Sequence, residues 1–175
     1  MADVGFPGLR GSDHFGVTVP DIEQATAFLV GVLGGEVVFE LGPVSHNDDF
    51  MATHMSIHPR SVIRKLRMIK VRNGPAVELF EYESPGQKSE LPRNSDWGGH
   101  HIAFYVDDMD TAISHLRRHG VKVQGNPTIL TTGPSAGLTW CYFLAPWGMQ
   151  MELVSYPRGL AYEGGAGPKL WDPRT

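Results

Sequence analysis

The sequence predicts an α+β fold made of two tandem βαβββ modules. Three observations lead to this prediction. The stretch HFGVTVPDIE, from His14, is similar to HIAFYVDDMD, from His101. The stretch GPAVELFEY, from Gly74, is similar to GMQMELVSY, from Gly148. The elements expected between these stretches follow the same order in both halves, which indicates two units of one design.

The same series of strands and helices is expected in both halves. An alternating apolar strand follows His14 and His101, and an acidic turn then leads into a segment with helical periodicity. Glycines beyond each segment are typical of helix ends. The expected helices cover 22–33 and 109–119. The expected later strands cover 36–41, 62–71 and 76–82 in the first half, and 121–124, 138–144 and 149–156 in the second.

The predicted organisation is a first module at 12–83, a linker at 84–98, a second module at 99–157 and an irregular C-terminal tail at 158–175. The linker is rich in proline, serine and charged residues. A sheet face in a module this small needs a partner, so we expect the modules to pack against each other or against a second chain. The tail is expected to cross the surface or to contact a partner chain.

The first module contains a long connection, 42–60, without a clear strand or helix pattern. Connections of this length are often functional. This one carries several titratable side chains, and it is interpreted either as a flap that covers the substrate or as a plain surface excursion. These side chains belong to His46, Asp48, Asp49, His54 and His58.

Composition excludes several classes of protein. The chain has 175 residues, and its apolar fraction of 41% is typical of a packed globular protein. A net charge of −4 does not favour nucleic-acid binding. Neither a signal-peptide pattern nor a run of eighteen apolar residues is present, so we expect a cytoplasmic protein without a membrane segment.

The single cysteine and the larger aromatic residues receive no chemical role. With only Cys141, the chain cannot form an intrachain disulfide or a thiolate-rich metal site. Cys141 is expected to be a small buried apolar residue. Core or pocket-lining positions are expected for Trp97, Trp140, Phe143 and Trp147.

A histidine and a glutamate recur at matching places in the two halves. His14 and His101 stand near the start of a first strand, and Glu78 and Glu152 lie in a last strand. Each residue alone has an ordinary explanation as a strand-end histidine or a solvent-facing glutamate. Their recurrence as pairs favours a shared site, because folding does not require it. Two imidazoles and two carboxylates suit a divalent ion such as Zn²⁺, Ni²⁺, Co²⁺, Mn²⁺ or Fe²⁺.

These motifs resemble the glyoxalase, bleomycin-resistance and extradiol dioxygenase superfamily, known as vicinal oxygen chelate proteins. The resemblance extends over about residues 12–157 and includes APWGMQMELVSYP near the end of the second module. It implies paired βαβββ modules whose curved mixed sheets surround one divalent metal ion, often in a homodimer. It also implies that His14, Glu78, His101 and Glu152 bind the metal, and that the substrate is a small molecule with two adjacent oxygens.

The two-histidine, two-glutamate pattern is similar to that of glyoxalase I, methylmalonyl-CoA epimerase and the epimerases of the cyclitol ketone 2-epi-5-epi-valiolone. The resemblance therefore implies an epimerase or isomerase that moves a proton next to a carbonyl through a metal-chelated enediolate. Glu152 is the expected base, with Glu78 acting on the opposite face. The polar segment 42–60 favours a cyclitol or a sugar-like hydroxy-ketone as substrate.

Other members of the superfamily stay open as alternatives. A lactoylglutathione lyase of the glyoxalase I type needs a basic cluster for glutathione, and only Arg60, Arg64 and Lys65 offer one. Methylmalonyl-CoA epimerase needs room for a long cofactor arm. Extradiol dioxygenases use two histidines and one carboxylate, so Glu78 argues against that chemistry. A metal-free binding protein for a small molecule is disfavoured by the four intact candidate ligands.

Overall fold

The computed structural model describes residues 6–175 and divides into two compact units. The first unit contains the residues up to Ile22 and Leu29–Pro85, and the second contains Glu23–Phe28 and Gly86–Thr175. Each unit holds one four-stranded sheet with parallel and antiparallel neighbours. The eight strands found within residues 6–175 confirm the predicted α+β fold of two βαβββ modules.

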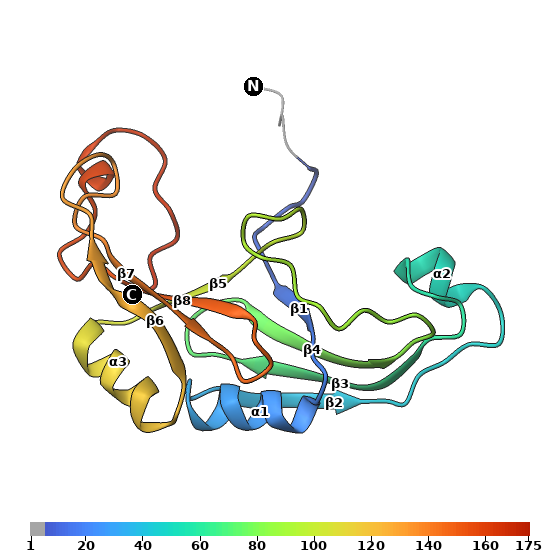
Figure 1. Cartoon of the computed structure of the whole chain (residues 1–175). Helices are drawn as coiled ribbons and strands as arrows, with labels where there is room; N and C mark the ends of the chain where they lie inside the picture. Colours follow the sequence, from blue (N-terminus) through green and yellow to red (C-terminus); the bar gives the residue numbers. More distant parts are fainter. Residues whose placement is uncertain (1–5) are drawn as a thin grey trace. The chain divides into compact units, whose positions relative to one another are not determined.

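The first sheet has the strand order β1-β4-β3-β2 (Figure 1). β1 is parallel to β4, whereas β3 is antiparallel to both β4 and β2. Alternation along β4 buries Val77 and Leu79 on one face and places Glu78 on the other. The strands are β1 (His14–Thr18), β2 (Glu36–Leu41), β3 (Val62–Lys70) and β4 (Ala76–Glu83).

The second sheet repeats this order as β5-β8-β7-β6. β5 is parallel to β8, and β7 is antiparallel to both β8 and β6. Alternation along β8 buries Met151 and Leu153 and places Glu152 on the other face. The strands are β5 (Ile102–Tyr105), β6 (Lys122–Ile129), β7 (Thr139–Leu144) and β8 (Gln150–Ser155).

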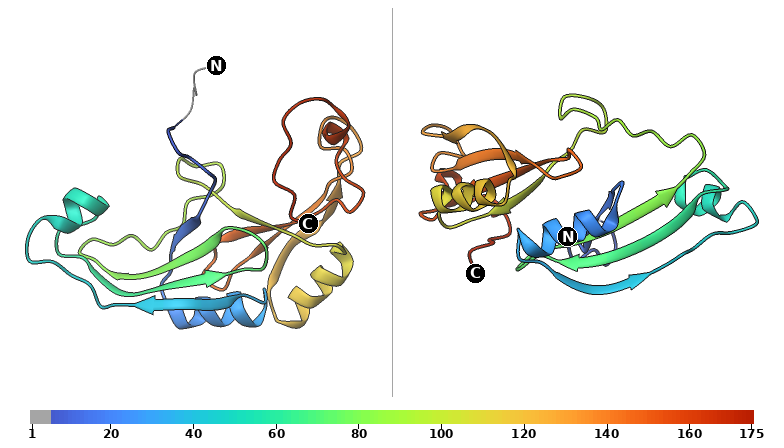
Figure 2. Two further views of the ribbon diagram at one scale, coloured as in Figure 1. Left: turned by 180° about the vertical axis from the view of Figure 1, so that it is seen from behind. Right: turned by 60° about the horizontal axis from the view of Figure 1, so that its bottom comes forward.

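The two longer helices occur where their periodicity predicts them. α1 (Ile22–Gly31) ends two residues earlier than expected, before Gly34, which has a left-handed φ of 72°. α3 (Met109–Arg118) is preceded by the N-cap residue Asp108, whose side chain accepts a hydrogen bond from the Thr111 backbone N–H at 2.9 Å. It packs beside β6 and β8 (Figure 2). The apolar residues on one of its faces are buried. These are Met109, Ile113 and Leu116.

β6 is longer than predicted. The sequence favoured a strand that stopped at Gln124, because glycine, asparagine and proline follow. The strand instead continues to Ile129 through an irregular stretch, with the pairing to β7 shifted between Gln124 and Thr128. Gly125 absorbs this irregularity with a φ of 68°.

The segment 42–60 is not an unstructured loop. It contains the short helix α2 (Phe50–Met55) and an isolated bridge between Val44 and Ile63. Met51 is fully buried and forms an apolar cluster with Ile63 and Leu66 of β3. The segment is therefore held against the first sheet by apolar burial, and we call it the flap.

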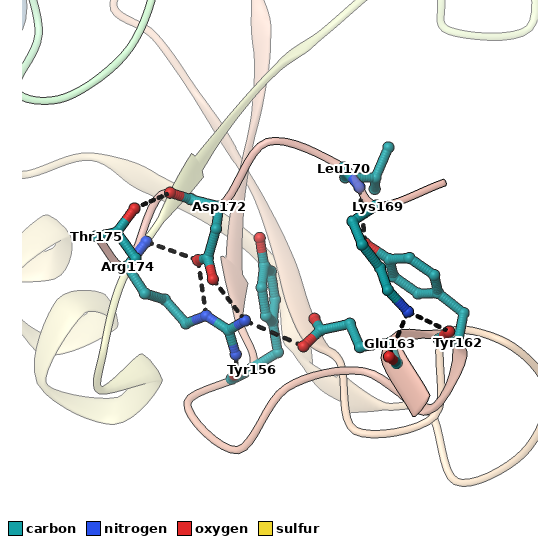
Figure 3. Close-up of polar contacts among 8 residues, drawn as sticks. All are labelled: Tyr156, Tyr162, Glu163, Lys169, Leu170, Asp172, Arg174 and Thr175. Carbon is teal, nitrogen blue, oxygen red and sulfur yellow. Dashed lines mark hydrogen bonds and ion pairs between the residues drawn. The ribbon is translucent and has the colours of Figure 1, made fainter. Parts of the chain in front are cut away.

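The C-terminal tail 158–175 folds back onto the second unit (Figure 3). It contains the 3₁₀ helix η1 (Ala161–Gly164), and its Ala161 and Tyr162 donate backbone hydrogen bonds to the loop that precedes β7. Near its end, the Arg174 guanidinium donates to Asp172 at 2.7 Å and to Glu163 at 3.1 Å. Arg174 also lies over the Tyr156 ring, 5.2 Å from its centroid. Charged and polar contacts therefore hold the tail in place.

Most of the predicted positions of aromatic residues are confirmed, with one clear exception. Phe143 is fully buried and Cys141 is 1% exposed, while Trp140 and Trp147 are partly buried. Trp97 is fully exposed, so the prediction of a core or pocket-lining position was wrong. It follows the charged residue Asp96 in a turn, where the chain has no strand alternation to direct it inward. Among residues 6–175, no helix is both long and apolar enough to cross a membrane.

Candidate metal centre

The first unit brings His14 and Glu78 together at the start of neighbouring parallel strands. His14 opens β1 opposite Ala76, and Glu78 lies two residues further along β4, opposite Gly16. The His14 Nε2 and Glu78 Oε2 atoms are 3.2 Å apart. We call the sheet face that carries this pair the inner face.

The second unit repeats the arrangement with His101 and Glu152. His101 immediately precedes β5, and Glu152 lies opposite Ala103 in the parallel pairing of β5 with β8. The His101 Nε2 and Glu152 Oε2 atoms are 3.1 Å apart. The inner face of this unit is the sheet face that carries Glu152.

The strand register explains why the two pairs have the same geometry. In both units the residue two positions after the histidine lies opposite the glutamate. Side chains two residues apart point to the same face of a strand, so the histidine and the glutamate meet diagonally. The residue opposite the glutamate is small in both cases, Gly16 or Ala103.

Both glutamates are more buried than their histidine partners. Side-chain exposure is 18% for Glu78 and 13% for Glu152, compared with 39% for His14 and 34% for His101. A carboxylate that is largely removed from water needs a positive partner. A protonated imidazole supplies part of this positive charge. When the imidazole is neutral, a divalent cation can supply it.

The two histidines differ in the group that contacts their second ring nitrogen. His14 Nδ1 lies 2.8 Å from the Asp13 carboxylate. This hydrogen bond is the largest cause of the raised pKa of His14; burial opposes the rise, and the charge of Glu78 adds to it. His101 Nδ1 instead lies 3.5 Å from the Asn94 side-chain nitrogen. A carboxylate at Nδ1 favours the tautomer that leaves Nε2 free to bind a metal.

Each pair has a spacing that fits two adjacent ligands of one ion. Zinc binds imidazole nitrogen and carboxylate oxygen at about 2.0 to 2.2 Å, so two such donors at a right angle lie about 3 Å apart. The observed distances of 3.2 Å and 3.1 Å agree with this value. Within residues 6–175, no group of three or more histidine, cysteine, aspartate or glutamate side chains is close enough to hold an ion. Each unit thus presents two of the four predicted ligands.

The neighbouring His100 and the flap histidines His46 and His54 make other contacts. His100 Nδ1 lies 2.9 Å from the carbonyl oxygen of Gly98. In the flap, the rings of His46 and His54 both lie against the Phe50 ring, with centroid distances of 4.1 Å and 4.4 Å. The Phe50 ring is stacked on the His46 ring and tilted against the His54 ring.

Two tyrosines near the pairs were not predicted from the sequence. Tyr142 of β7 lies directly opposite Glu152, and Tyr82 of β4 lies four residues beyond Glu78 on the same face. Burial raises the pKa of both hydroxyls, and the nearby glutamate adds to the rise. Both tyrosines therefore stay protonated near neutral pH. Strand alternation marks Tyr82 as an inner-face residue, but Tyr142 is recognised only from the pairing of β7 with β8.

Comparison with protein families matches residues 13–142 to the Glyoxalase/Bleomycin resistance protein/Dioxygenase superfamily. Among curated proteins, a 2-epi-5-epi-valiolone epimerase from an Actinomyces species is 40% identical over 174 residues. This match covers 99% of the present chain and 94% of the relative.

Solved structures of low sequence identity share the fold. A glyoxalase family protein from Bacillus cereus has a TM-score of 0.66 at 18% identity, covering 89% of this chain and 97% of that one. The fosfomycin resistance protein FosX from Listeria monocytogenes, solved with Mn(II) and sulfate, has a TM-score of 0.54 at 19% identity. That match covers 84% of this chain and 93% of FosX.

Proposed function

Because the chain belongs to the glyoxalase/bleomycin resistance protein/dioxygenase superfamily and is an enzyme of the isomerase type, we propose that it is a metal-dependent epimerase of a hydroxylated cyclic ketone. The proposed substrate is 2-epi-5-epi-valiolone or a closely related cyclitol ketone. One observation carries the proposal: the same strand register builds a His–Glu pair in each unit, in a chain that is 40% identical to a 2-epi-5-epi-valiolone epimerase.

The proposed metal ligands are His14, Glu78, His101 and Glu152. Their nitrogen and oxygen donors suit Zn²⁺, Ni²⁺, Co²⁺, Mn²⁺ or Fe²⁺, and FosX, which shares the fold, has been solved with Mn(II). When bound, the cation supplies Lewis-acid stabilisation of negative charge on the substrate oxygens. The two pairs come together either within one chain or between two copies of it.

The proposed proton transfer uses the two glutamates. Glu152 accepts the proton from the carbon next to the carbonyl, and the electron pair of that C–H bond moves toward the carbonyl oxygen. Glu78 delivers a proton to the opposite face of the same carbon, which inverts its configuration. Exchange with water then removes the proton from Glu152 and returns one to Glu78. The position of each carboxylate, 3.2 Å or 3.1 Å from the imidazole of a proposed metal ligand, supports these roles because it places the base beside the proposed ion.

A direct test follows hydrogen exchange in deuterated water. Metal-free protein is loaded separately with each candidate ion and mixed with 2-epi-5-epi-valiolone, and deuterium at the carbon beside the carbonyl is measured by NMR. We expect exchange only in the metal-loaded protein. Glu152→Gln keeps an oxygen that can bind the ion but cannot accept the proton, so exchange should fall by about 10² to 10⁴-fold.

The control removes an exposed carboxylate from the first sheet, away from both His–Glu pairs. Glu83 lies at the end of β4, is exposed, and pairs with Arg64 at 3.1 Å. Glu83→Gln should leave the exchange rate within about twofold, because surface ion pairs contribute little. An equal loss in both variants, or unchanged exchange in Glu152→Gln, would contradict the assignment of the base. Exchange that is as fast without metal would contradict the metal dependence.

A further inference from the structure

The inner faces of the two units differ beside the glutamates. In the second unit Tyr142 lies opposite Glu152, and Trp140 lies opposite Val154. In the first unit the equivalent positions are Met68, opposite Glu78, and Leu66, opposite Phe80. The first unit is therefore apolar at two places where the second carries a phenol and an indole.

The aromatic side chains of the second unit form a continuous row that begins at the proposed metal ligand. The Tyr142 ring lies edge-on to the His101 ring, with a centroid distance of 5.3 Å and an interplanar angle of 80°. The Trp140 ring lies 5.1 Å from the Tyr142 ring at an angle of 60°. Each ring limits the movement of the next, so the row is a rigid surface beside the ligand pair.

Polar groups continue this surface across the sheet. Gln124 of β6 lies opposite Tyr142, which in turn lies opposite Glu152, so the three side chains stand in line on one face. Gln124 is exposed and Tyr142 is partly buried. Among residues 6–175, no group forms a hydrogen bond with the Tyr142 hydroxyl, so this donor is available to a ligand.

Core packing alone does not explain why Tyr142 and Trp140 occupy these positions. Leu66 and Met68 show that apolar side chains fill the same two positions in the first unit, where Leu66 is only 7% exposed beneath the flap. Trp140, by contrast, stays partly exposed although it is large and apolar. A partly exposed indole next to an unpartnered phenol is suited to a ligand with both C–H and hydroxyl groups.

We propose that Tyr142 and Trp140 bind the ring of a polyhydroxylated substrate beside Glu152. The Tyr142 hydroxyl hydrogen-bonds with a hydroxyl of that ring, and the Trp140 indole packs against its C–H face. This inference rests on the proposed function, and it makes the second unit the one that selects for a hydroxylated ring.

The test compares Tyr142→Phe and Trp140→Leu with a matched control, Met68→Leu. The ketone substrates are 2-epi-5-epi-valiolone and a set of analogues that each lack one ring hydroxyl. Loss of one neutral hydrogen bond corresponds to roughly a threefold to tenfold effect, and Tyr142→Phe should raise KM by this amount with little change in kcat. One analogue should already show the loss in wild-type protein and lose nothing further in Tyr142→Phe. Met68→Leu should change KM by less than about twofold.

A binding measurement separates failure of this inference from failure of the proposed reaction. A cyclitol that keeps the ring hydroxyls but lacks the ketone is titrated calorimetrically into metal-loaded protein, and metal affinity is measured in parallel. Weaker cyclitol binding in Tyr142→Phe and Trp140→Leu, with unchanged metal affinity, supports the inference even where no ketone is turned over. Equal cyclitol binding in all four proteins would overturn it. So would a parallel loss of metal affinity, because the two residues would then act by supporting the ligand pair.

Discussion

The two units have one ligand geometry and two different surroundings. His14 with Glu78 and His101 with Glu152 have nearly the same spacing, because both pairs come from the same parallel strand register. The segments that cover the units are unrelated: a flap inserted between β2 and β3 in the first, and a C-terminal tail in the second. The part that needs a fixed register is repeated, whereas the covering segments are free to differ.

The largest effect that we expect comes from removing either pair. If the pairs are equivalent halves of one site, His14→Ala/Glu78→Ala and His101→Ala/Glu152→Ala should each abolish bound metal and lower activity by about a thousandfold or more. Metal content by elemental analysis and deuterium exchange measure the two effects. A small loss in one variant and a complete loss in the other would show that the pairs are not equivalent.

The same variants determine whether the pairs meet within one chain or between copies. When the two double variants are co-expressed, a site shared between two subunits should be rebuilt in mixed dimers. Half of the dimers would be mixed and each would have one intact site, so about a quarter of the wild-type activity should return. A site within one chain would give no recovery, because every chain lacks one pair.

A smaller effect is expected from the anchor of the flap. Met51 is fully buried between the flap and β3, so Met51→Ala should lower the free energy of unfolding by about 2 to 5 kcal/mol. Denaturant unfolding measures this change. Met55→Ala is the matched control, because Met55 is only partly buried against the same cluster and should cost less. Equal losses would mean that Met51 is not the principal anchor.

Particular residues show what the sequence could predict and what it could not. Strand alternation and the repeat were enough to select both histidines and both glutamates, because these signals are local. The pairing of Tyr142 with Glu152 escaped prediction, since it depends on which strands become neighbours. Met51 was missed because one buried residue in a polar segment creates no periodic pattern. The strand assignment also failed at Gly125, where a turn-like sequence continues β6 through an irregularity.

The smallest expected effect concerns the C-terminal tail. The anchors of the tail and of the flap should respond differently to salt. Arg174 joins the end of the tail to Glu163 of η1 and to the Tyr156 backbone carbonyl, and its guanidinium is oriented by Asp172 (Figure 3). All of these contacts are charged or polar. Arg174→Ala should therefore increase proteolytic cleavage within 158–175 by roughly threefold to tenfold, since cleavage follows local opening.

The control for this prediction is Arg158→Ala, which removes an exposed arginine from the same tail. It should leave cleavage of the tail unchanged, and Arg174→Lys should give an intermediate rate, because lysine keeps the charge but loses the planar, two-pronged contact with Asp172. High salt should speed cleavage of the wild-type tail by screening these contacts, while the flap, which is anchored by Met51, should be insensitive to salt. If salt opened both segments equally, the contrast between an apolar anchor in the first unit and a charged one in the second would be wrong.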